Sequence, residues 1–222
     1  MSTLTKPLAA VLLTSVLIFP PCSFAFETPL SDTAVREAYF LGQHHDEVYA
    51  DFLQKYGVAL PIPRSGPHIA SIALFTPYAL TAMYSNQQSG SYSAQQAQLD
   101  HDKRPELVRI VVQIWFTSTY GAYIIQPAGS GSAAPRGFQP RSPDFWRDFR
   151  VRLYQKDELV IPANSSGEPL QSCGDDSGCE LSGATLTFEY LATAFSEGTA
   201  TVLVTPPEGE PVSVDFDLTA LR

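Results

Sequence analysis

The sequence predicts an α+β protein that is mainly β, with short N-terminal helices followed by an antiparallel two-sheet β-sandwich, immunoglobulin-like in general architecture. Apolar residues between 32 and 56 recur at helical spacing. After residue 68, about seven short segments rich in β-branched and aromatic residues alternate with Gly- and Pro-containing turns, as in sandwich proteins. We expect a signal peptide at 1–25, a helical segment with a proline-rich connector at 26–67, and a β-rich domain at 68–222.

Residues 1–25 have the pattern of a secretory signal. Lys6 precedes an apolar run over 8–19, and small residues occupy the −3 and −1 positions of a cleavage site after Ala25. The run is too short to cross about 30 Å of hydrocarbon, which disfavours an uncleaved anchor. Lipidation at Cys22 is an alternative, but Phe19-Pro20-Pro21 lacks the small residues that a lipoprotein peptidase usually needs. We therefore expect export and cleavage near Ala25, without a lipid anchor.

The segment that follows the signal predicts helices. Ser31 and Asp32 are good N-cap residues, and apolar positions after them keep helical spacing. Gly42 interrupts that spacing. We expect either two helices, over 32–41 and 44–56, or one bent helix.

Residues 68–84 predict a long strand, broken or bulged near Pro77, because β-branched and aromatic residues are frequent there. Ser93 can cap a helix over 94–101. The strongest strand pattern covers 107–120, where five apolar residues alternate along one face, and we expect this strand to be central. The alternating residues are Val108, Ile110, Val112, Ile114 and Phe116.

The second half of the chain predicts a loop and further hairpins. Residues 121–143 are rich in Gly, Ser, Ala and Pro, which predicts a flexible loop. Segments 146–155 and 158–163 are expected to form a hairpin across Lys156 and Asp157. Further strands are expected over 184–192, 199–205 and 212–218.

Two cysteines remain after signal cleavage. Cys173 and Cys179 form an even pair in an oxidising compartment, which predicts a disulfide. The loop between them is short, so the bridge is expected to stabilise less than a crosslink over a long loop.

Two short stretches carry a resemblance. The opening Glu27-Thr28-Pro29-Leu30-Ser31-Asp32, its continuation over 34–42, and the ending Asp215-Phe216-Asp217-Leu218 resemble a group of exported bacterial proteins of unassigned function. The resemblance implies bacterial origin and export, to the periplasm or the medium. It carries no activity, cofactor or catalytic residue.

Charge excludes some partners. The net charge is −9, and loss of Lys6 with the signal makes it more negative. We expect no nucleic-acid binding, because that requires a basic stripe, although arginines between 136 and 152 leave a local positive face open. No transmembrane segment is expected in the mature chain.

Three polar clusters contain residues that could form a site. His44-His45-Asp46-Glu47 could supply metal ligands, but two on one helix face are too few. We therefore expect an exposed helix surface or a helix junction, and no metal. Asp100-His101-Asp102 places carboxylates next to a histidine, the pairing that can orient a general base. It lies at a predicted helix end, so we expect an exposed polar terminus. Asp175-Asp176-Ser177 could attract calcium, although turn chemistry explains this sequence equally well. Phosphate-loop and dinucleotide motifs do not occur, and we expect no cofactor.

The remaining candidates are aromatic. Tyr123, Phe138 and Trp146 flank the predicted loop and could form a stacking surface, the alternative being ordinary core packing. We favour an exported, noncatalytic binding or interaction protein whose partner is an unknown protein or glycan of the cell envelope. The alternative is a secreted, glycosidase-like hydrolase, whose two carboxylates are dispersed in sequence and leave no motif.

Overall fold

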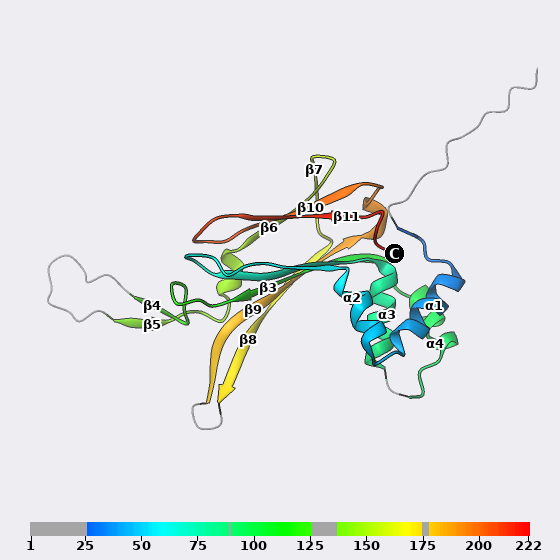
Figure 1. Ribbon diagram of the computed structural model, residues 1–222, viewed down its shortest axis with the longest axis horizontal. Helices are drawn as coiled ribbons and strands as arrows, with labels where there is room; N and C mark the ends of the chain where they lie inside the picture. Colours follow the sequence, from blue (N-terminus) through cyan, green and yellow to red (C-terminus); the bar gives the residue numbers. More distant parts are fainter. Residues whose placement is uncertain (1–25, 89, 126–136, 175–177) are drawn as a thin grey trace, which may run out of the picture.

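The computed structural model describes residues 26–88, 90–125, 137–174 and 178–222. Two antiparallel sheets are stacked, and the helices of the described part gather at one end of them (Figure 1). The predicted α+β, mainly β sandwich is thus confirmed. The predicted signal, residues 126–136 of the predicted loop, and the candidate calcium ligands at 175–177 lie outside the described residues.

The first sheet has the strand order β1-β2-β3-β9-β8. β3 (Leu107–Trp115) is its middle strand, as the alternation predicted, and the four apolar side chains Val108, Ile110, Val112 and Ile114 are fully buried. The other strands are β1 (Gly57–Ala59), β2 (His68–Phe75), β8 (Asn164–Gly174) and β9 (Gly178–Leu191).

The second sheet has the order β11-β10-β6-β7. Lys156 and Asp157 both have positive φ and form the two-residue turn predicted between β6 and β7. Leu153, Val202 and Val214 from this sheet share one core with the buried face of the first sheet. The strands are β6 (Arg150–Gln155), β7 (Glu158–Val160), β10 (Thr199–Thr205) and β11 (Val212–Asp217).

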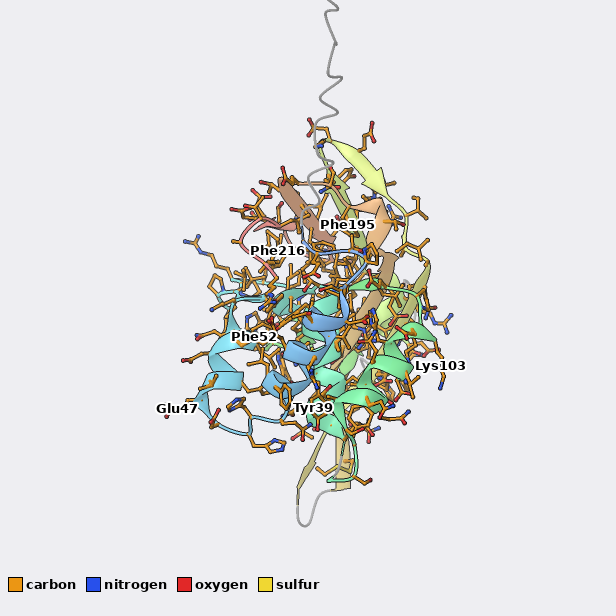
Figure 2. The ribbon with its side chains drawn as sticks, turned by 90° about the vertical axis from the view of Figure 1, so that its right-hand side faces the viewer. Tyr39, Glu47, Phe52, Lys103, Phe195 and Phe216 are labelled. Carbon is orange, nitrogen blue, oxygen red and sulfur yellow. A yellow bond between two sulfur atoms is a disulfide. The ribbon has the colours of Figure 1, made fainter. Side chains whose placement is uncertain are left out.

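The helices form a second, smaller cluster at one end of the sandwich. They are α1 (Asp32–Gly42), α2 (Glu47–Gln54), α3 (Pro77–Gln87) and α4 (Ala94–Asp102). Each begins after a side chain that accepts a backbone N–H: Ser31, Asp46, Thr76 and Ser93. α1 packs on α3 and α4. Figure 2 looks onto this end, with Glu47 and Lys103 on opposite sides.

The strand predicted over 68–84 is wrong in its second half. β2 ends at Phe75, and α3 begins at Pro77, where the missing proline N–H costs no helical hydrogen bond. α3 is buried on two sides, because Ala79 belongs to the sandwich core and Ala82 to the helical cluster. Its sequence therefore lacks the single apolar stripe that marks a surface helix.

Two hairpins extend beyond the sandwich (Figure 1). The first consists of β4 (Tyr123–Ile125) and β5 (Phe138–Pro140). The second is the far end of β8 and β9, where Cys173 and Cys179 face each other and form the predicted disulfide. Short 3₁₀ turns cover Phe145–Asp148 and Ala192–Ala194. In the part of the chain that the structure describes, no helix is long and apolar enough to cross a membrane.

Candidate functional site

The structure separates the three aromatic residues predicted as a ligand surface. Tyr123 and Phe138 lie on one side of the β4–β5 hairpin and are 53% and 70% exposed. Trp146 is partly buried and packs on the backbone of β8, so tightly that a Cβ on Gly167 would lie 2.3 Å from the indole Cδ2. Trp146 therefore has a packing role, whereas the hairpin pair is free to meet a partner.

The histidines before α2 are held by local hydrogen bonds. His44 Nδ1 lies 3.4 Å from Asp46 Oδ2, and His45 Nδ1 lies 3.1 Å from Asn86 Nδ2. Within the described ranges, no group of three or more His, Cys, Asp or Glu side chains gathers as a metal-ligand set.

A cavity of about 270 Å³ lies between α3, α4 and the start of β3. Leu107 and Arg109 line it from β3, on the strand face opposite the buried Val108. α3 and α4 supply most of the remaining lining. Those residues include Leu80, Met83 and Tyr84 from α3, and Ala97, Asp100 and His101 from α4.

Two tyrosines and an arginine form one side of the cavity. The rings of Tyr84 and Tyr92 meet edge to face, with centroids 5.8 Å apart. The Arg104 guanidinium lies 4.2 Å from the centroid of the Tyr84 ring, a cation–π distance. Burial, reinforced by the Asp100 carboxylate, raises the pKa of Tyr92 to about 12. Tyr92 is therefore neutral near pH 7, and its hydroxyl donates to the Asp100 carboxylate.

Glu106 closes the cavity near the N-terminal segment. Its Oε1 accepts from the Leu30 N–H at 2.6 Å and lies 3.1 Å from His101 Nε2, and its Oε2 accepts from the Thr28 hydroxyl at 2.5 Å. Burial alone would raise the pKa of Glu106, but these contacts with His101, Thr28 and Leu30 outweigh it and hold the pKa below its ordinary value. The carboxylate is therefore an ionised, fully engaged acceptor.

Sequence reasoning missed the pairing of His101 with Glu106. It considered only the adjacent carboxylates, but Asp100 accepts from Gln96 at 2.8 Å and Asp102 from Gln98 at 2.9 Å. One feature of the sequence indicates where Glu106 lies: it follows Pro105, which ends the helical segment, so Glu106 must lie in the turn between α4 and β3.

Chemically, the cavity offers apolar walls, a guanidinium, and a phenol whose hydroxyl is engaged with Asp100. No protein-family model matches the chain, and no curated protein matches it significantly. The geometry of the cavity is therefore the observation that bears most directly on function.

Proposed function

We propose that this protein is an exported, noncatalytic binding protein whose ligand occupies the cavity between α3, α4 and β3. The cavity carries the proposal, because apolar walls with a few placed polar groups are typical of small-molecule sites. Glu106 is poorly suited to act as a general acid, since its lowered pKa keeps it ionised near pH 7. The signal pattern and the Cys173–Cys179 disulfide support export.

A panel of six compounds tests this proposal: octanoate, octanol, octylamine, benzoate, benzyl alcohol and benzylamine. Each is titrated into residues 26–222 and followed by amide NMR shifts. We expect at least one compound to shift amides around the cavity. Leu107→Trp, which fills the cavity from β3, should abolish that binding, and Met83→Trp blocks it from α3.

The matched control is Leu159→Trp, the same substitution at an exposed position of β7 in the other sheet. It should leave binding unchanged. If no compound binds, or if binding survives both blocking variants, the cavity is not the ligand site.

One observation favours the hydrolase alternative. Asp100 and Glu106 line the same cavity, and a glycosidase requires two convergent carboxyl groups. A general acid needs a raised pKa, however, and that of Glu106 is lowered. Chromogenic aryl glycosides test this alternative. Turnover by the wild type that is lost in both Asp100→Asn and Glu106→Gln would replace the binding proposal with a hydrolase.

An envelope protein or glycan remains the partner predicted from the sequence. The exposed pair Tyr123 and Phe138 is one surface available to it, on the β4–β5 hairpin at the opposite end of the molecule from the helices (Figure 1).

A further inference from the structure

We infer that the cavity binds a small apolar molecule with one anionic group, and that the Arg104 guanidinium is the partner of that group. This inference rests on the proposed binding function and names the chemical class of the ligand. The charged side chains that line the cavity differ in whether they already have a partner of opposite charge or a hydrogen-bond donor.

The carboxylates of the cavity are engaged. Glu106 accepts from Thr28 and Leu30 and contacts His101, and Asp100 accepts from Gln96. A cationic ligand would have to compete with these donors. The chemistry of the cavity therefore disfavours an ammonium group.

The two arginines of the cavity differ in their partners. Arg109 donates to Glu189 Oε1 through Nη2 at 2.9 Å and Nε at 3.2 Å, so its charge is paired. Arg104 is exposed and takes part in none of the ion pairs found among the described residues. Its contact is with the face of the Tyr84 ring, which leaves the N–H groups at the edge of the guanidinium available. Such a planar fork matches a carboxylate.

The remaining lining fits the body of such a ligand. Leu80, Met83 and Leu107 provide apolar surface. The Tyr92 hydroxyl is already a donor to the Asp100 carboxylate, which leaves Arg104 as the donor for a ligand. A dry cavity of about 150 Å³ is enough to bind benzene. The volume of about 270 Å³ therefore has room for one ring or a short alkyl chain.

The six compounds form two sets, one aliphatic and one aromatic, whose members share the same apolar body and differ in carrying a carboxylate, a hydroxymethyl or an aminomethyl group. Octanoate and benzoate should bind at least about tenfold more tightly than the matching alcohols and amines, since about 1.4 kcal/mol corresponds to tenfold. Arg104→Gln should remove that advantage and leave the affinity for the alcohols unchanged. Arg104→Lys keeps the charge but loses the fork, and should give an intermediate affinity. Arg147→Gln, at an exposed arginine near Trp146, is the control.

The outcomes separate this inference from the proposed function. If alcohols bind as tightly as carboxylates and Leu107→Trp abolishes both, the cavity binds ligands but the anion inference is wrong. Tightest binding of the amines would overturn it in favour of Asp100. Carboxylate binding that Arg104→Gln leaves unchanged would remove Arg104 as the partner. If no compound binds, the proposed function itself fails.

Discussion

Glu106 connects three segments that are far apart in the sequence. Its carboxylate holds Thr28 and Leu30 of the N-terminal segment and contacts His101 of α4. Its backbone oxygen accepts from the Ala192 N–H at the end of β9, at 2.9 Å. The N-terminal segment therefore docks on the sandwich through this ionised side chain, in addition to the buried Phe26 ring, which packs against Phe195.

This docking predicts a pH dependence of stability. Because the folded pKa of Glu106 lies below its ordinary value of 4.5, its contribution is complete above that value and is lost as pH falls through the lowered folded pKa. Glu106→Gln should lower the free energy of unfolding at pH 7 by roughly 1–3 kcal/mol. The variant should also lose less stability than the wild type between pH 5 and pH 3, as measured by urea unfolding.

The control for this measurement is Glu210→Gln, at an exposed turn position, which should keep the wild-type pH profile. Identical profiles for the wild type and Glu106→Gln would show that Glu106 does not couple to folding.

Trp146 and Phe138 should respond differently to truncation. Trp146→Ala removes an aromatic ring packed against Gly167, and should cost about 3 kcal/mol of unfolding free energy. Phe138→Ala removes a ring that is 70% exposed and should change stability by no more than about 0.5 kcal/mol. Denaturant unfolding of the two variants measures both values. Equal losses would contradict the packing role of Trp146.

The sequence predicts those helices and strands that carry one clear local pattern, such as a cap or an apolar alternation. The helix predicted over 94–101 is confirmed, because Ser93 is a clear N-cap. The strand predicted over 107–120 is confirmed as far as Trp115, where β3 ends, because its apolar residues alternate. The sequence of α3 predicts a strand instead of a helix, because a helix buried on two sides shows no single apolar stripe. β8 was missed because its mostly exposed sequence carries no apolar alternation, and it is positioned by hydrogen bonds to β9.

The candidate site was less predictable than the fold. The cavity is built from α3, α4 and β3, and a pattern read along one segment cannot reveal how three segments converge. The pairing of His101 with Glu106 depends on the turn at Pro105, and the Tyr84–Arg104 contact depends on how α3 packs against that turn. The disulfide was predictable because both cysteines lie in one hairpin.

The contact between α1 and α3 requires the absence of a side chain at Gly42. A Cβ there would lie 2.2 Å from the Ala82 backbone oxygen. In an ordinary helix, Gly→Ala stabilises by up to about 1 kcal/mol. Gly42→Ala should instead destabilise by about 1–3 kcal/mol, because α1 must move away from α3. Thermal unfolding monitored by circular dichroism gives the sign.

Gly57→Ala is the matched control, since a Cβ at that position of β1 would lie 3.6 Å from the Ala73 Cβ, an ordinary contact. It should be close to neutral. Stabilisation by Gly42→Ala would show that the helices can separate at no cost.

Across the whole molecule, stability is concentrated in the sandwich core and the helical cluster. α3 contributes to both, which couples them. The arm formed by the far ends of β8 and β9 lies away from both cores, with Cys173 and Cys179 exposed (Figure 1). The disulfide therefore closes a short loop in a part of the molecule that contributes little buried surface.

Removing the disulfide should consequently have a small and local effect. The double variant Cys173→Ser/Cys179→Ser should lose at most about 2 kcal/mol of unfolding free energy, the loop-entropy value for so short a loop. Its urea transition should remain single and coincide by tryptophan fluorescence and far-UV circular dichroism. Amide NMR shifts should change in the arm and stay unchanged around Glu106. A larger loss, or two separate transitions, would mean that the arm stabilises the sandwich to which it is attached.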